Sequence, residues 1–158
     1  MAQEQHFVEK VSLRVTINIA LKKEYIGEIF LSYAPQLSLV ERLRVFFQGF
    51  TRYIPFKLES GEVMMVKKES IAYLKFSGAR HLQTKSTQDV GPFITLRKKA
   101  EILLQNNQSL QGTIVKDKMQ SHNRLLDCLN KTEDLLLLET YGYTYILPHT
   151  YIEWVKDG

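Results

Sequence analysis

Residues 25–32, YIGEIFLS, and residues 110–117, LQGTIVKD, follow one pattern, in which a glycine lies between two apolar residues that are each two positions away. Both segments contain β-branched residues, which are typical of strands. A glycine inside a strand marks a bend, because a β-carbon is most obstructive where strands curve most. We therefore predict that Gly27 and Gly112 lie at the curved points of two similar strands.

A strand is predicted before each of these segments. From Val11 to Leu21 apolar residues alternate with polar ones, which is typical of a half-buried strand. A polar turn at 22–24 then joins it to the glycine strand. In the second half, apolar residues alternate from Ala100 to Leu104, and the polar turn QNNQS at 105–109 follows. Each half is thus predicted to begin with two strands joined by a tight turn.

A short helix is predicted after the second strand of the first half. Within residues 35–50 the apolar side chains Leu39, Leu43, Phe46 and Phe47 recur at three- and four-residue spacing. Ser38 precedes them as an N-cap, with Glu41 three residues later as its capping-box partner. Residues 124–130, RLLDCLN, repeat the pattern of residues 42–48, RLRVFFQ, and predict a corresponding helical turn in the second half.

Three further strands are predicted in each half. Their composition is β-rich and turn residues separate them; they are 53–58, 61–67 and 70–76 in the first half and 134–140, 143–149 and 151–156 in the second. Residues 77–92 contain almost no apolar side chains, and they include two glycines and a proline. This composition indicates a linker. The sequence therefore predicts a first unit at 1–77, a linker at 78–92 and a second unit at 93–158.

Five landmarks recur in the same order in both halves, at offsets between 81 and 85 residues. They are Leu13-Arg14 with Leu96-Arg97, Gly27 with Gly112, Arg42-Leu43 with Arg124-Leu125, Val66 with Leu147, and Ile71 with Ile152. This recurrence favours an internal duplication. Five short strands are too few for a sandwich but suit a small bent barrel. The predicted fold is mainly β, with two tandem five-stranded small barrels, each carrying a short helical turn.

Composition indicates a globular chain and argues against several classes of protein. Of the 158 residues 44% are hydrophobic, which is enough for packed cores, and no apolar run reaches the roughly 18 residues that a membrane span needs. The start, MAQEQHFVEK, lacks the features of a secretory signal, so a cytoplasmic location is expected. The net charge of +4 is too small to indicate a nucleic-acid or membrane partner by itself.

The sequence carries no constellation typical of catalysis. Cys128 has no cysteine to pair with and lies in an apolar segment, where a thiol packs as a small hydrophobe. The four histidines stand apart, and neither a phosphate-binding glycine loop nor a nucleophile elbow is present. We expect a protein that is not an enzyme, with no metal site and no cofactor.

The pattern resembles the Sm-like (LSm/Hfq-type) family. The resemblance rests on residues 100–117, AEILLQNNQSLQGTIVKD, which are similar to the family's first two strands and the turn between them. It rests also on residues 66–74, VKKESIAYL, and 147–155, LPHTYIEWV, which are similar to its closing strand, turn and strand. The resemblance implies two Sm-like barrels. An SH3-like barrel of another lineage, or a bacterial family built from two such units, fits the same strand pattern.

The resemblance also implies where RNA would bind. In Sm-like proteins RNA contacts come from the turn between the last two strands, which corresponds here to residues 67–69 and 148–150. Lysines there would neutralise phosphates and a ring would stack on a base. The candidate RNA-binding residues are Lys67, Lys68 and His149.

Aromatic side chains gather near the end of the chain and form a second candidate site, made of Tyr141, Tyr143, Tyr145, Tyr151 and Trp154. Such a stripe can stack on bases, or it can fill an interface while its hydroxyls stay wet. We favour the interface. The expected function is protein interaction or assembly, with another protein or a second copy as partner through strand edges. RNA binding is the alternative, and neither a membrane nor a small-molecule cofactor is expected.

Overall fold

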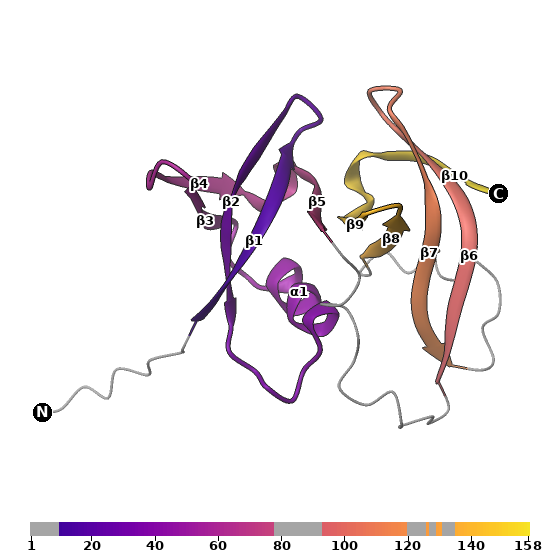
Figure 1. The fold of residues 1–158 in the computed structure, drawn as a ribbon, viewed down its shortest axis with the longest axis horizontal. Helices are drawn as coiled ribbons and strands as arrows, with labels where there is room; N and C mark the ends of the chain where they lie inside the picture. Colours follow the sequence, from indigo (N-terminus) through magenta and orange to yellow (C-terminus); the bar gives the residue numbers. More distant parts are fainter. Residues whose placement is uncertain (1–9, 78–92, 120–125, 127–128, 131–134) are drawn as a thin grey trace, which may run out of the picture.

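The computed structural model describes residues 10–77, 93–119, 126, 129–130 and 135–158. This part of the chain is mainly β (Figure 1). In the first half the elements are β1 (Lys10–Ile19), β2 (Lys23–Ser32), α1 (Leu39–Gln48), β3 (Tyr53–Leu58), β4 (Val63–Lys67), the 3-10 turn η1 (Lys68–Ser70) and β5 (Ile71–Ser77). In the second half they are β6 (Phe93–Leu104), β7 (Ser109–Met119), β8 (Leu136–Thr140), β9 (Tyr143–Leu147), the 3-10 turn η3 (His149–Tyr151) and β10 (Ile152–Asp157).

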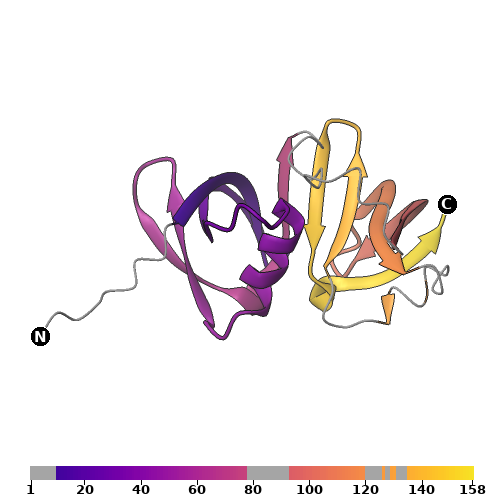
Figure 2. The ribbon, with the colours of Figure 1, turned by 90° about the horizontal axis from the view of Figure 1, so that it is seen from below.

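The ten described strands form a single open antiparallel sheet, in the order β10-β6-β7-β8-β9-β5-β1-β2-β3-β4. Within each half, the last strand lies beside the first, and the remaining strands follow in chain order. The two halves are joined because β5 pairs with β1 on one side and with β9 on the other. Figure 2 shows that the sheet curves strongly within each half and that the halves lie side by side. The sequence predicted two tandem five-stranded barrels, whereas the structure shows strongly curved halves joined in one open sheet.

The two halves use the same strand register. Val15 lies opposite Gly27 in the β1–β2 pair, and Ala100 lies opposite Gly112 in the β6–β7 pair. The β5–β1 and β10–β6 pairs both shift register at one irregularity, between Asn18 and Ile19 in the first half and between Ile152 and Trp154 in the second. The loops before β4 and β9 both contain a glycine at positive φ, Gly61 at 93° and Gly142 at 88°.

This register corrects one landmark of the sequence comparison. Because Val15 corresponds to Ala100, Arg14 corresponds to Lys99 rather than to Arg97. The two arginines nevertheless make similar ion pairs, Arg14 with Glu59 and Arg97 with Glu139. The sequence comparison was two residues out of register at this landmark. Residues two apart in a strand lie on the same face, so the alternation of apolar and polar residues does not distinguish Arg97 from Lys99.

The predicted first helix is confirmed. The side chain of Ser38 accepts a hydrogen bond from the Glu41 amide at 3.2 Å, which satisfies one of the free N–H groups of the first turn. Leu43, on the buried face, belongs to the core of the first half. Most of the second predicted helix, residues 124–130, lies outside the described residues. Within it, the Asn130 amide donates to the Leu126 carbonyl at 3.1 Å, the spacing of one helical turn.

Replacing Ser38 with alanine is expected to lower the free energy of unfolding by about 1 kcal/mol, because the Glu41 amide loses its acceptor. Urea denaturation measures this loss. Ser38→Asp, which keeps an acceptor at the cap, is the control and is expected to retain the stability. Equal losses in both variants would contradict the capping role.

Among the described residues, buried apolar side chains form two clusters, one in each half of the sheet, and each cluster includes residues from the other half. Leu137 and Ile146 come from the second half but belong to the cluster of the first. Ala72 and Tyr73 come from the first half but belong to the cluster of the second. Each core is therefore completed by strands of the other half. The predicted linker, 78–92, lies outside the described residues.

Candidate interaction edges

The junction between the halves is an antiparallel strand pair. In it Leu74 lies opposite Ile146, Lys75 opposite Tyr145, Phe76 opposite Thr144 and Ser77 opposite Tyr143. Leu74 and Ile146 are at most 1% exposed, so this pair is as deeply buried as the centre of either core. We name the β5–β9 pair the internal junction. It shows how the fourth strand of one half and the last strand of the other fit together.

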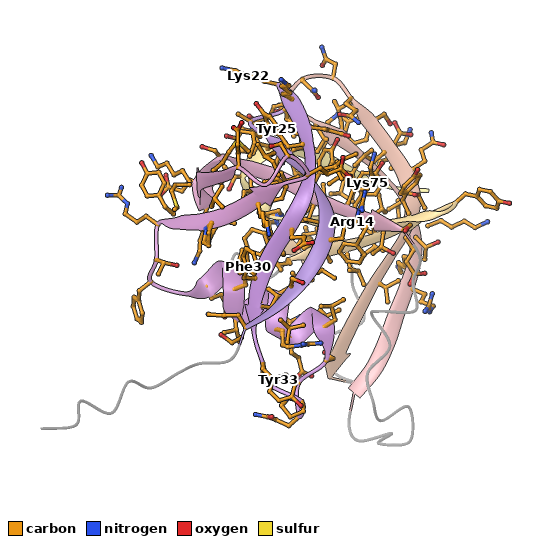
Figure 3. All side chains as sticks on the ribbon, turned by 60° about the vertical axis from the view of Figure 1, so that its left-hand side comes forward. Arg14, Lys22, Tyr25, Phe30, Tyr33 and Lys75 are labelled. Atoms are coloured by element: carbon orange, nitrogen blue, oxygen red, sulfur yellow. The ribbon has the colours of Figure 1, made fainter. Side chains whose placement is uncertain are left out.

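One side of the internal junction carries aromatic rings around a lysine. The rings of Tyr73 and Tyr145 meet edge to face with centroids 5.2 Å apart. The ammonium of Lys75 lies 4.9 Å from the ring centroid of Tyr143 and 5.9 Å from that of Tyr145. Lys75, labelled in Figure 3, also pairs with Glu24 at 3.5 Å. The cation–π and aromatic contacts join β5 to β9. The ion pair with Glu24 joins β5 to the start of β2.

Tyr73, which is 1% exposed, is the centre of a polar network that reaches from the core to the surface at Glu24. Its hydroxyl donates to the Glu24 carboxylate and accepts from the Asn18 side-chain amide at 3.2 Å. The side-chain carbonyl of Asn18 accepts from the Leu21 amide at 2.8 Å. This bond holds the β1–β2 turn, where Leu21 has a φ of 59°. Burial, followed by the bond to the Glu24 carboxylate, raises the pKa of Tyr73 above its ordinary value.

Removing the Tyr73 hydroxyl is expected to cost about 1–3 kcal/mol of unfolding free energy, because Asn18 and Glu24 each lose a partner beside the core. Thermal or urea unfolding of Tyr73→Phe tests this. The control is Tyr53→Phe, at a ring that is 56% exposed, which is expected to stay within about 0.5 kcal/mol of the wild type.

The same hydroxyl predicts a pH dependence. The folded-state pKa of Tyr73 lies above the ordinary value of 10.0, so its contribution to stability is complete below pH 10 and is lost as the pH rises further. The wild-type protein is therefore expected to lose stability faster than Tyr73→Phe above pH 10. Parallel stability curves for the two proteins in that range would contradict the role of the hydroxyl.

Among the strands that the structure describes, the two outermost, β4 and β10, each pair with one neighbour only. By their register these strands correspond to the two that meet in the internal junction, β4 to β9 and β10 to β5. Exposure differs sharply between equivalent positions. Met65 is 68% exposed where Ile146 is 1%, and Trp154 is 39% exposed where Tyr73 is 1%. We name β4 and β10 the open edges.

The structure separates the predicted aromatic site. Tyr143 and Tyr145 lie on β9, in the internal junction, whereas Trp154 lies on the open edge β10. Tyr141 is fully exposed in the turn before β9, and Tyr151 lies in η3 and packs partly against the second core. These residues therefore do not share one surface.

The predicted RNA-binding residues lie in the two 3-10 turn regions. Lys67 ends β4 and pairs with Glu69 at 3.9 Å. Lys68 opens η1, donates to the Gly49 carbonyl at 3.1 Å and lies 5.8 Å from the Phe46 ring centroid. Partial burial lowers the pKa of Lys68. His149 opens η3 in the other half. The two lysines are neighbours, and the histidine belongs to the equivalent turn.

Sequence reasoning missed the internal junction and the network around Tyr73. One signal was present, because β5 contains apolar residues at both alternating positions, Ala72, Tyr73, Leu74 and Phe76 among them. A strand with one wet face shows regular alternation, and a near-continuous apolar run indicates a strand covered on all sides. The sequence around Asn18 and Glu24 does not indicate Tyr73 as their partner, because it lies 55 and 49 residues away along the chain.

Among the described residues no group of three or more His, Cys, Asp or Glu side chains is arranged to hold a metal ion. In the same part of the chain no helix is both long enough and apolar enough to cross a membrane. A shallow cavity of about 360 Å³ near Gly27 is lined by charges of both signs, those of Arg14, Glu28, Lys57 and Glu59. Arg14 and Glu59, which both line this cavity, form an ion pair with each other.

Comparisons of the chain with models of protein families, with curated proteins and with solved structures give no match.

Proposed function

We propose that this chain is a non-catalytic binding module that associates with protein partners by strand addition at its open edges. The contrast between equivalent strands carries the proposal. β5 is buried along nearly its whole length because β9 covers it, whereas its counterpart β10 is exposed at most positions. An unpaired edge offers free backbone N–H and C=O groups to an incoming strand.

Apolar exposure on the edge supports this proposal. On β4 both Val63 and Met65 are more than half exposed, and they point to the same side because they are two residues apart. Proteins protect free edges with charges, prolines or bulges when no partner is intended. Although Pro55 on the neighbouring β3 lies opposite Met65, β4 itself presents two apolar side chains, Val63 and Met65, to the solvent.

We further propose that each half is a copy of one small-barrel unit of the Sm-like type. The shared strand order, the register around Gly27 and Gly112, and the paired turns η1 and η3 support a common unit. A unit of this size has a marginal core. The exchange of side chains through the internal junction then gives each copy the apolar contacts that it lacks alone.

Site-specific photocrosslinking of the full chain in living cells tests the proposed function. A photoreactive benzoyl-phenylalanine at position 65 or 154, on the open edges, is expected to yield protein adducts. The matched control is position 22, at the tip of the β1–β2 turn, where the side chain points away from the sheet (Figure 3). Adducts absent from both edges, or equally abundant at position 22, would contradict the proposal.

RNA binding is the second candidate, and the surroundings of Lys67 favour it. Tyr53, which is 56% exposed, lies opposite Lys67 in the β3–β4 pair. The Lys68 amide donates to the carbonyl of the exposed Arg52, and Phe50 nearby is fully exposed. Basic side chains together with exposed aromatic rings suit single-stranded nucleic acid. The basic side chains pair with phosphates, and nucleobases stack on the rings.

A salt titration with labelled single-stranded RNA of mixed sequence tests this candidate by fluorescence anisotropy. Affinity is expected to fall linearly with the logarithm of salt, and Tyr53→Ala is expected to cost about 1–3 kcal/mol if a base stacks there. Tyr33→Ala, at a similarly exposed ring beyond the end of β2, is the control. Lack of binding at about 50 mM salt would exclude RNA as the ligand.

A further inference from the structure

We infer that α1 and the loop after it form a contact surface for an anionic lipid membrane, with Phe50 as the side chain that enters the lipid. This inference goes beyond the proposed function, because the ligand is a lipid surface rather than a strand. We name residues 39–53 together with residues 67–70 the basic end. They comprise α1, the loop to β3, the last residue of β4 and η1.

Lys68 brings the separate segments of the basic end together. Its amide donates to the Arg52 carbonyl at 2.8 Å, and its ammonium donates to the Gly49 carbonyl at 3.1 Å. The Gly49 amide in turn donates to the Val45 carbonyl at 3.0 Å, where the helix ends. The backbone is therefore held on both sides of Phe50, which lies between Gly49 and Arg52 in the chain.

Two apolar side chains of the basic end lie in solvent. Phe50 is 106% exposed, so almost nothing in the described part of the chain covers its ring. Val45 is 55% exposed and lies on the helix face away from the core, since Leu43, two residues earlier, is buried. Neither side chain has a polar atom that favours water, so burial against another molecule is favourable for both. Exposed apolar groups that share one surface mark such a contact.

The basic end also holds most of the net charge of the chain. It contains five basic side chains and two acidic ones, which gives +3 (5 − 2 = 3) of the total of +4. The charge of the whole chain did not indicate a membrane, because it averages this end with a nearly neutral remainder. Anionic lipids attract clusters of lysine and arginine that lie near their surface. The basic side chains are Arg42, Arg44, Arg52, Lys67 and Lys68.

The mixture of side chains favours lipid over nucleic acid at this surface. A nucleobase stacks on a flat ring, and Val45 has no flat face to offer. A lipid interface accepts aliphatic and aromatic side chains alike, while lysine and arginine reach the headgroup phosphates along their alkyl stems. Arg52, two residues after Phe50, is exposed as well. One loop thus presents both the ring for the lipid and a cation for the headgroups.

Sedimentation of the full chain with lipid vesicles tests the inference. Vesicles of phosphatidylcholine and phosphatidylglycerol in equal parts are expected to bind the chain at low salt, and vesicles of phosphatidylcholine alone are expected to bind it much less. Added salt should weaken the binding, because it screens the attraction between the basic end and the headgroups. Absence of binding to the anionic vesicles, or equal binding to both kinds, would overturn the inference.

Phe50→Ala is expected to weaken binding to the anionic vesicles at least about tenfold, because the lipid no longer buries a phenyl ring. The matched control is Tyr141→Ala, which removes an equally exposed ring from the turn before β9 and is expected to bind like the wild type. Both rings are fully exposed, so the fold of each variant should persist, as circular dichroism would show. Equal binding by Phe50→Ala and the wild type would overturn the inference.

Charge reversal tests the contribution of the basic end. Arg52→Glu is expected to weaken binding to the anionic vesicles about tenfold or more. Lys22→Glu makes the same change in net charge at the tip of the β1–β2 turn (Figure 3) and is expected to have a smaller effect. Equal losses in the two variants would show that only the net charge matters, and would overturn the assignment of the contact to the basic end.

A polarity-sensitive fluorophore tests whether position 50 enters the lipid. In a background of Cys128→Ser, which removes the one native cysteine, Phe50→Cys carries the label, and Tyr141→Cys carries it in the control. Only the label at position 50 is expected to shift its emission to the blue when anionic vesicles are added. A shift at neither position, or an equal shift at both, would overturn the insertion of this loop.

The outcomes separate this inference from the proposed function. Protein adducts at positions 65 and 154 test strand addition whether or not vesicles bind. If the chain binds single-stranded RNA but no vesicles, and Phe50→Ala removes the RNA binding, the basic end is a nucleic-acid site and the inference fails.

Discussion

Replacing Ile146 with alanine is expected to lower the free energy of unfolding by about 2–5 kcal/mol. Ile146 is 1% exposed and, although it belongs to β9, it packs in the core of the first half. Truncation leaves a cavity between the halves where neighbouring strands cannot collapse. Urea denaturation with tryptophan fluorescence from Trp154, the one tryptophan of the chain, provides the measurement.

The chain offers an unusually close control for this change. Met65 holds the equivalent position on β4 but is 68% exposed, because none of the ten described strands pairs with that edge. Met65→Ala is expected to change the stability of the single chain by no more than about 0.5 kcal/mol. Comparable losses in the two variants at low protein concentration would contradict the assignment of β9 to the internal junction.

Adding a methyl group at Gly27 or Gly112 is expected to cost at least about 3 kcal/mol. A β-carbon at Gly27 would lie 2.2 Å from the Lys57 carbonyl oxygen, and one at Gly112 would lie 2.4 Å from that of Glu139. Neither backbone can withdraw without losing the pairing of β2 with β3 or of β7 with β8. Thermal unfolding of Gly27→Ala and Gly112→Ala measures the effect.

Gly49→Ala is the matched control for these two variants. Its backbone has a φ of −61°, which alanine adopts freely, and the nearest atom to an added β-carbon lies 3.4 Å away. Stability should be unchanged or rise slightly, because alanine restricts the unfolded chain. A loss at Gly49 as large as at Gly27 would show that close approach of the neighbouring strand is not the cause.

The local structure could be read from the sequence because its signals are local. Alternating apolar residues predicted β1, and Ser38 with the apolar spacing after it predicted α1. Gly27 was predicted to lie where its strand bends; the structure shows that the carbonyl of Lys57 occupies the space that a β-carbon at this residue would need. Each of these features depends on residues near one another in the chain or on one steric requirement.

The joining of the halves could not be read in the same way. Backbone hydrogen bonds are alike for every strand, so the sequence of β5 alone does not predict that β9 is its partner. The apolar run around Tyr73 and Leu74 indicates only that both sides are covered. The aromatic stripe was likewise predicted as one surface, although Tyr143 lies on β9 in the internal junction and Trp154 lies on the open edge β10.

The order of β5 and β9 along the chain has a consequence for biosynthesis. Ser77, the last residue of β5, leaves the ribosome 70 residues before Leu147, the last residue of β9 (147 − 77 = 70). At about 5–20 residues per second this interval lasts roughly 4–14 seconds. Throughout it the newly made first half has no β9 to cover β5, so nascent chains on one messenger are at risk of swapping strands with their neighbours.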